Sequence, residues 1–140
     1  MAFDFDLLTR WLAALEGGTY KQAKWQLRDG DGFCCLGVAC DLYDPSKWRD
    51  GGWRDGYWWD EGWGDGEGKV LTPDVASALG LRFFNGRFGV PGEGMWMYCL
   101  SERNDEGATF AEIAALIRSR PPGLFTPEAE AVLADKWGPK

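Results

Sequence analysis

The sequence predicts an α+β fold in which several short helices surround a small antiparallel sheet. It is expected to be a single compact domain over residues 1–140, with a long Trp/Gly/Asp-rich loop at residues 44–68. Three observations predict this. Apolar residues recur at helical spacing in several segments, residues typical of helix starts and ends flank those segments, and an Asn-Gly pair separates two short apolar runs. A chain of 140 residues is the usual size of a domain with one core.

The first two helices are predicted from apolar patterning. Residues 4–16 are expected to form an amphipathic helix, because apolar side chains repeat at helical spacing from Leu8 to Leu15 and a Gly-Gly pair follows as a stop signal. Residues 33–43 are expected to form a buried helix. This segment has no polar residue before Asp41, and its small residues suit close packing.

Three further helices are predicted from their first residues. Thr72 and Thr126 each precede a proline and an acidic residue, which combines an N-cap hydroxyl with proline at the first helical position. The segment Thr109–Glu112 is a capping box ahead of an apolar stripe, and this helix should end at Pro121. The helix after Thr72 should run to Gly80.

A hairpin is predicted between the helices that follow Thr72 and Thr109. Residues 81–84 and 87–90 flank Asn85-Gly86, the dipeptide best suited to a type I′ turn. The pair Val70-Leu71 is expected to form one more short strand.

The loop at residues 44–68 contains a five-residue duplication, Trp48–Gly52 followed by Trp53–Tyr57. Its glycine and aspartate content predicts little regular structure. Two interpretations of its tryptophans stay open. The rings can stack on a nucleobase or contact a partner protein, or they can pack on the domain as a satellite core.

Charge and composition exclude several classes of function. A balance of 15 basic against 22 acidic residues gives a net charge of −7, so neither a long nucleic acid nor an anionic membrane is expected as a partner. No apolar run approaches the ~20 residues of a transmembrane helix, and the N-terminus is acidic where a secretory signal is basic. Four clustered cysteines indicate reduced thiols, so a soluble intracellular protein is expected.

A basic segment is the strongest candidate for a ligand site. It holds Lys21, Gln22, Lys24 and Arg28, and a Gly-rich turn then leads into the predicted helix at residues 33–43. Backbone N–H groups at a helix start, together with lysine and arginine, suit phosphate or another small anion. The alternative is a solvated charged face, because no Walker-type or dinucleotide fingerprint is present.

The cysteines allow a second interpretation. Cys34 lies at the predicted helix start, where the dipole lowers a thiol pKa, so it is the candidate nucleophile if the protein is an enzyme. The chain has no histidine to act as its base, and burial as a small apolar residue is the alternative. The spacing of Cys34, Cys35 and Cys40 does not fit structural zinc, so no metal or other cofactor is expected.

Two blocks of the sequence resemble a known family. The first comprises Tyr20-Lys21-Gln22, Leu27-Arg28 and Phe33–Leu42, and the second comprises Leu100, Asn104-Asp105-Glu106-Gly107 and the capped segment from Thr109 to Ala114. Together they are similar to a widespread family of small tailed-bacteriophage proteins, from whose usual residues Trp25 and Arg103 depart. The resemblance implies a phage origin and action in the cytoplasm of the host bacterium, and it implies no particular activity.

Three functional hypotheses follow. The first is a phage accessory protein that binds and sequesters a small phosphorylated, nucleotide-like ligand and so counters host immune signalling. The second is a hydrolase that cleaves such a signal with Cys34 or Asp105, and the third is an inhibitor that binds a host defence protein through the Trp-rich loop. Whether the protein is an enzyme or a homo-oligomer stays open. The candidate ligand-binding residues are Tyr20, Lys21, Gln22, Arg28, Trp48, Trp53, Asn104 and Asp105.

Overall fold

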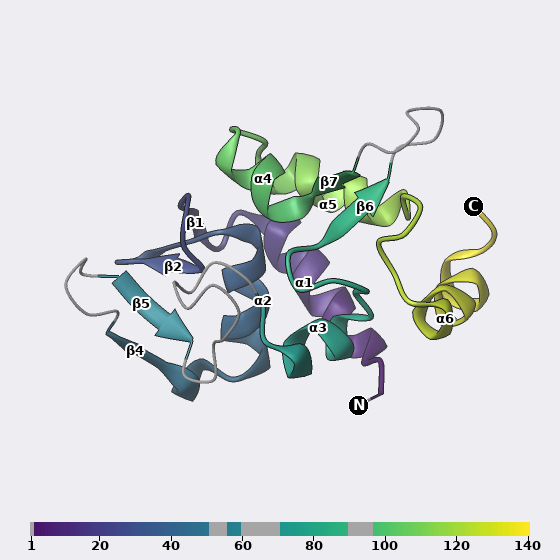
Figure 1. Cartoon of the computed structure of the whole chain (residues 1–140), viewed down its shortest axis with the longest axis horizontal. Coiled ribbons are helices and arrows are strands. Elements are labelled where there is room, and N and C mark those ends of the chain that lie inside the picture. The colour runs from purple at the N-terminus through teal and green to yellow at the C-terminus, as the bar shows by residue number, and fades with distance from the viewer. Residues whose placement is uncertain (1, 51–55, 60–70, 90–96) are drawn as a thin grey trace.

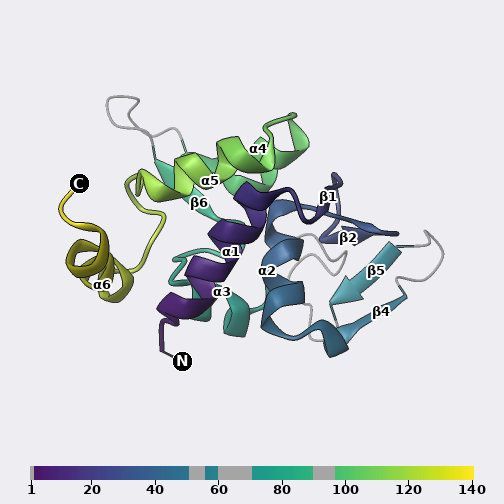
Figure 2. The same cartoon turned by 180° about the vertical axis from the view of Figure 1, so that it is seen from behind.

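The computed structural model describes residues 2–50, 56–59, 71–89 and 97–140. In this part of the chain, six α-helices accompany seven short strands, which confirms the predicted α+β fold. Helix α1 lies at the centre and packs against α2, α3 and α5 (Figures 1 and 2). The helices are α1 (Phe5–Gly17), α2 (Cys35–Tyr43), α3 (Pro73–Leu79), α4 (Leu100–Asp105), α5 (Phe110–Arg118) and α6 (Pro127–Trp137).

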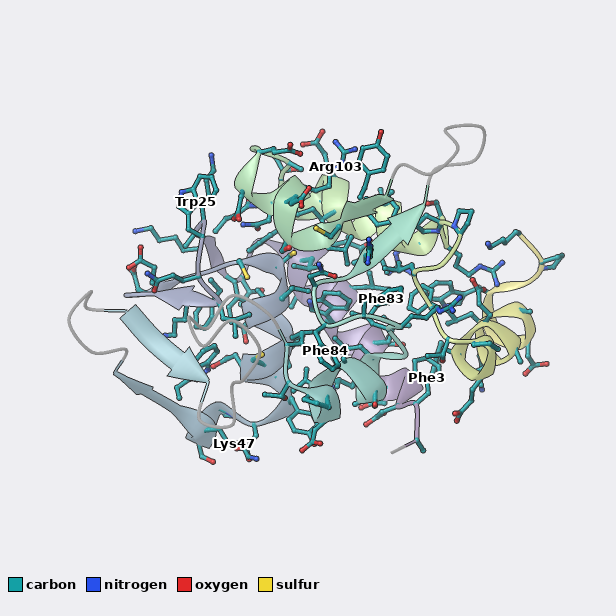
Figure 3. All side chains as sticks on the ribbon, in the orientation of Figure 1. Phe3, Trp25, Lys47, Phe83, Phe84 and Arg103 are labelled. Carbon is teal, nitrogen blue, oxygen red and sulfur yellow. The ribbon has the colours of Figure 1, made fainter. Side chains whose placement is uncertain are left out.

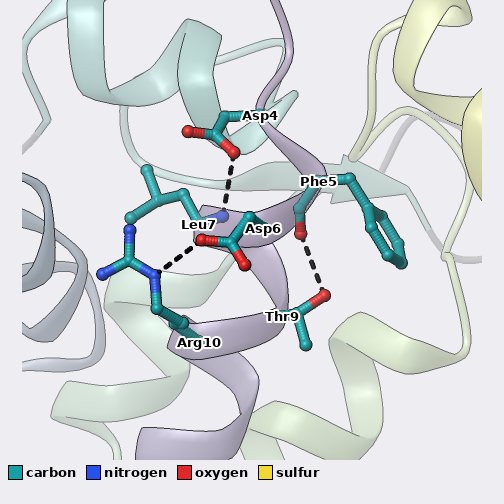
Figure 4. A network of polar contacts seen from close by, with 6 residues as sticks. All are labelled: Asp4, Phe5, Asp6, Leu7, Thr9 and Arg10. Carbon is teal, nitrogen blue, oxygen red and sulfur yellow. Dashed lines mark hydrogen bonds and ion pairs between the residues drawn. The ribbon is translucent and has the colours of Figure 1, made fainter.

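Helix α1 confirms the first predicted helix. Its N-cap is Asp4, whose Oδ1 accepts the Leu7 N–H at 3.1 Å (Figure 4). Its C-cap is Gly18, which has the left-handed φ of 70° that favours glycine. The buried Trp11 ring joins α1 to α2, because its Nε1 donates to the Cys35 carbonyl at 2.8 Å.

Helix α2 confirms the predicted buried helix and begins two residues later than the range of 33–43. All its residues from Cys35 to Cys40 are buried. The residue before it, Cys34, donates its N–H to the Leu27 carbonyl at 3.1 Å. This bond fixes the start of the helix against the chain that leads into the sheet.

The main sheet has the strand order β1-β3-β2-β5-β4. The pair β1–β3 is parallel and the other three pairs are antiparallel, so the predicted antiparallel sheet is correct except for one pair. Both views show β4 and β5 on the side of α2 that faces away from α1 (Figures 1 and 2). The strands are β1 (Lys21–Gln22), β2 (Arg28–Asp29), β3 (Gly32–Phe33), β4 (Trp48–Asp50) and β5 (Gly56–Trp59).

The prediction that residues 44–68 lack regular structure is wrong for the described part of this segment. A short 3₁₀ helix covers Pro45–Lys47, and β4 then pairs with β5 in a register that places Trp48 opposite Trp59. Strand β5 also pairs with β2, so the segment extends the sheet instead of forming an irregular loop. Residues 51–55 and 60–68 of the predicted loop lie outside the described residues.

The predicted hairpin at residues 81–90 is also wrong. Strand β6 (Arg87–Gly89) pairs with β7 (Met97–Cys99), whereas Leu81 forms an isolated bridge with Phe125. Gly86 has a φ of 72°, but Asn85 does not have the positive φ that a type I′ turn also requires. Leu100 packs against Gly86 where a Cβ would lie. Of the predicted strand Val70-Leu71, Leu71 is in no strand and Val70 lies outside the described residues.

The three predicted helix starts at threonine are confirmed. Thr109 forms a complete capping box with Glu112, and the Thr126 hydroxyl accepts the Ala129 N–H at 3.2 Å. Thr72 precedes α3 without a side-chain cap bond, and its hydroxyl is buried with no partner among the described residues.

Candidate functional site

Arg28 lies against aromatic rings at the face of the main sheet. Its guanidinium carbon is 4.9 Å from the centroid of the Phe33 ring and 5.6 Å from that of Trp48. Its Nε donates to the Gly30 carbonyl at 3.1 Å, which ties the side chain to the predicted Gly-rich turn. A guanidinium over aromatic faces is attracted by the ring quadrupoles, and guanidinium groups are frequent partners of carboxylate and phosphate.

Asp41 fixes two of the rings around this arginine. Its Oδ2 accepts the Tyr20 hydroxyl at 2.7 Å and its Oδ1 accepts the Trp48 Nε1 at 3.0 Å. Burial and the hydrogen bond to Asp41 raise the pKa of Tyr20 above its ordinary value, so the phenol stays neutral. We define the Arg28 cluster as Tyr20, Arg28, Phe33, Asp41 and Trp48.

Edge-to-face contacts complete the Arg28 cluster. The Tyr20 and Phe33 ring centroids lie 5.1 Å apart, and those of Phe33 and Trp48 lie 5.9 Å apart. The structure therefore brings together three predicted ligand-binding residues, Tyr20, Arg28 and Trp48. Phe33 and Asp41 were not predicted as site residues. In the sequence, Phe33 begins the Cys-rich block and Asp41 lies seven residues before Trp48.

Two predicted residues at this end of the sheet are not part of the Arg28 cluster as described. Lys21 is exposed in β1, and its Nζ lies 3.3 Å from Asp31 Oδ1. A surface pair of this kind is weak, so the Lys21 ammonium stays accessible to an anion. Trp53 lies outside the described residues.

Gln22 and Asn104, which were predicted as ligand-binding residues, link the two sequence blocks by hydrogen bonds. Gln22 Nε2 donates to Asn104 Oδ1 at 2.9 Å and to the Ala108 carbonyl at 2.8 Å. Asn104 is fully buried, and it also accepts the Cys35 N–H and donates to the Ala23 carbonyl. Because these amide hydrogens are already bonded, they do not serve a ligand, and the two residues hold the fold together.

Asp105 holds an exposed tryptophan in place. Its Oδ1 accepts the Trp25 N–H at 2.9 Å and lies 3.3 Å from Asn104 Nδ2. Trp25 has a φ of 75°, which is rare for a bulky residue, and its side chain is 63% exposed beyond β1 (Figure 3). Asp105 therefore has a positioning role. Trp25 was not predicted as a site residue, although it lies in the basic segment, directly after Lys24.

The four cysteines are free thiols and are buried, which fits their interpretation as core residues better than that of Cys34 as a nucleophile. Cys34 is the N-cap of α2, and burial raises the pKa of its thiol to about 12. Burial also raises the pKa values of Cys35 and Cys40 well above their ordinary range. Such thiols stay protonated at neutral pH, which supports the interpretation of these cysteines as core residues.

This arrangement gives a prediction for thiol labelling. In the native protein, a maleimide reagent at pH 7.5 should leave Cys34, Cys35 and Cys40 unmodified for as long as the fold is intact. All three should react within minutes in denaturant, because unfolding returns their pKa values to the ordinary range. Peptide mass spectrometry reads the sites, and rapid native labelling of Cys34 would contradict its placement in the core.

In the ranges given above, no three His, Cys, Asp or Glu side chains gather as a metal site. Within the same ranges, no helix is both long enough and apolar enough to cross a bilayer.

The fold and the Arg28 cluster thus define an α+β protein in which an arginine of the main sheet lies over two aromatic rings. Residues 5–120 match the family described as Domain of unknown function (DUF8296), and the chain belongs to this family. The matched region contains the Arg28 cluster and the Gln22–Asn104 link, and it ends before α6. Comparison with curated proteins and with solved structures gave no match.

Proposed function

We propose that the protein binds a small phosphorylated, nucleotide-like ligand at the Arg28 cluster and holds it unchanged. The observation that carries this proposal is the position of the Arg28 guanidinium against the Phe33 and Trp48 rings. A guanidinium pairs with phosphate through two parallel N–H groups, and an aromatic face stacks on any nucleobase. The Arg28 cluster therefore combines the two kinds of group that recognise a nucleotide, a guanidinium and aromatic rings.

The rigidity of the Arg28 cluster supports binding. Asp41 holds Tyr20 and Trp48 from both carboxylate oxygens, so these rings lose little conformational freedom when a ligand arrives. Lys21 on the neighbouring strand adds a second cation for a phosphate, as a point charge without the arginine fork.

The biological role in this proposal follows from the resemblance to tailed-phage proteins. In this role, a phage accessory protein acts in the host bacterial cytoplasm. It captures a nucleotide immune signal and so removes the signal without a chemical step. The hydrolase alternative loses support from the buried, protonated Cys34 and from the positioning role of Asp105. Trp25 favours the inhibitor of a host defence protein as second candidate, since exposed tryptophans are frequent binding hot spots.

The test is titration of the purified protein with nucleoside monophosphates, cyclic dinucleotides and inorganic phosphate. Arg28→Ala should weaken binding of the best of these ligands at least ~10-fold, or about 1.4 kcal/mol. The affinity of Arg28→Lys should lie between those of the wild type and Arg28→Ala, because lysine keeps the charge but cannot pair with phosphate through two parallel N–H groups. Loss of the ring contacts should lower the stability of Arg28→Ala by only about 1 kcal/mol, read by thermal unfolding.

The matched control is Arg10→Ala, which removes an exposed arginine that pairs with Asp6 on α1 (Figure 4). It should bind like the wild type. Equal affinity of Arg28→Ala and the wild type would remove the proposal. Ligand recovered after denaturation should be intact by mass spectrometry, whereas altered ligand indicates the hydrolase, and a host protein that co-purifies without ligand indicates the inhibitor.

A further inference from the structure

A second candidate site lies away from the Arg28 cluster. A pocket of about 390 Å³ is formed where the end of α5, the segment after it, strand β6 and the C-terminal residues meet. This volume falls within the range of small-molecule sites, about 300–1,000 Å³. Both views place the connection between α5 and α6 on the opposite side of α1 from β4 and β5 (Figures 1 and 2). The residues that line the pocket include Phe88, Leu116, Arg120, Pro121, Pro122 and Lys140.

Most of the pocket wall is apolar. Phe88 comes from β6, Leu116 from α5, and the two prolines from the segment that follows α5. The wall is held in place by the backbone, since the Gly89 N–H donates to the Pro122 carbonyl at 2.7 Å. A preformed apolar wall with few polar groups is the usual construction of a small-ligand site.

The polar groups of this wall include a buried guanidinium. Arg120 is 5% exposed, and its Nη2 donates to the Gly138 carbonyl at 2.7 Å. Its Nη1 lies 3.7 Å from Glu130 Oε1, which is too long for a hydrogen bond. A guanidinium has five N–H donors, so in the described part of the chain this buried cation uses a minority of them.

The backbone of Arg120 is also unusual. Its φ is 52°, in the left-handed region that an arginine rarely adopts. The Arg120 N–H donates to the Ile117 carbonyl at 3.0 Å, so the residue closes α5 in this conformation directly before Pro121. Strained conformations of this kind persist where the surrounding structure fixes them, and they gather at ligand sites.

Charge decides which ligand fits. Lys140 Nζ also lies 3.7 Å from Glu130, at Oε2, so two cations in the pocket wall share one carboxylate. We propose that this pocket binds a small monoanionic carboxylate with an apolar body. The carboxylate accepts N–H groups of Arg120, and the apolar body lies between Phe88, Leu116 and the prolines.

Octanoate is the probe that tests this site, and 1-octanol is its uncharged match. Calorimetric titration of the full chain should show octanoate binding at least tenfold more tightly than 1-octanol, because only octanoate pairs with Arg120. In the unmutated protein, NMR shift changes should centre on Phe88, Leu116 and Arg120. Equal affinity for the two probes, or shift changes centred on the Arg28 cluster, would overturn the proposal.

Two variants sharpen the test. Leu116→Trp places a large ring in the pocket and should reduce octanoate affinity at least tenfold, whereas Ala115→Trp on the exposed side of the same helix should leave it unchanged. Arg120→Lys keeps the charge and loses the fork, so it should weaken octanoate and leave 1-octanol unaffected. If Leu116→Trp folds and binds octanoate with wild-type affinity, the proposed site is refuted. If that variant does not fold, the octanoate affinity of Arg120→Lys and the NMR shift changes of the unmutated protein test the site.

Discussion

Gly37→Ala is expected to destabilise the protein by about 3 kcal/mol or more, the upper range for overpacking. A Cβ on Gly37 would overlap the carbonyl group of Leu27. That carbonyl cannot move away freely, because it accepts the Cys34 N–H at 3.1 Å and precedes strand β2. Since a domain has a total stability of about 5–15 kcal/mol, urea unfolding of this variant should show a much lower midpoint.

Gly17→Ala is the matched control, because it replaces a helical glycine by the same residue. The nearest atom to a Cβ there is the Thr19 hydroxyl oxygen at 3.6 Å, an ordinary contact. Alanine is the better helix former by roughly 0.5–1 kcal/mol, so this variant should be as stable as the wild type or slightly more stable. Similar urea midpoints for the two variants would show that Gly37 has no packing role.

Five of the six α-helices in the described residues could be predicted, because their signals are local, whereas α4 was not predicted. The stripe from Leu8 to Leu15, the threonine starts and the terminal glycines each act within a few residues, and the structure has a helix at each. These signals are independent of the rest of the chain, so neither the wrong hairpin nor the wrong loop affected them.

The strand pairings could not be predicted, because they depend on distant residues. A turn spans Phe83 to Gly86, because the Gly86 N–H donates to the Phe83 carbonyl at 3.1 Å, but β6 pairs with β7 instead of with residues 81–84. The same holds for residues 44–68. Their Gly and Asp residues indicate turns, but they do not show that Trp48 and Trp59 lie opposite each other in a sheet. The pairing of β2 with β5 likewise joins segments that no local pattern connects.

The composition of the Arg28 cluster was predicted only in part. Sequence patterns placed Tyr20, Arg28 and Trp48 among the ligand residues, and the structure gathers them around Phe33 and Asp41. Spacing alone could not show that the amide hydrogens of Gln22 are already bonded. Its two acceptors lie 82 and 86 positions along the chain, and only the fold brings them together.

Asn104→Ala is expected to lower stability by about 3 to 5 kcal/mol, because it leaves several buried groups without partners. The Cys35 N–H loses its acceptor at 3.1 Å, the Ala23 carbonyl loses its donor at 2.8 Å, and Gln22 loses one of its two bonds. Each unsatisfied buried group costs roughly 1–3 kcal/mol. For a chain of this size, the melting temperature should fall by roughly 10 to 20 °C.

Asn85→Ala and a double-mutant cycle separate this effect from a general loss of an asparagine. Asn85 is half-buried, its side chain has no hydrogen bond among the described residues, and its loss should cost less than ~1 kcal/mol. Gln22→Ala and Asn104→Ala should be non-additive, with a coupling of about 0.5–3 kcal/mol, because both remove the same 2.9 Å bond. Calorimetric unfolding of the four proteins measures that coupling. Strict additivity would mean that the hydrogen bond between Gln22 and Asn104 does not join the two sequence blocks.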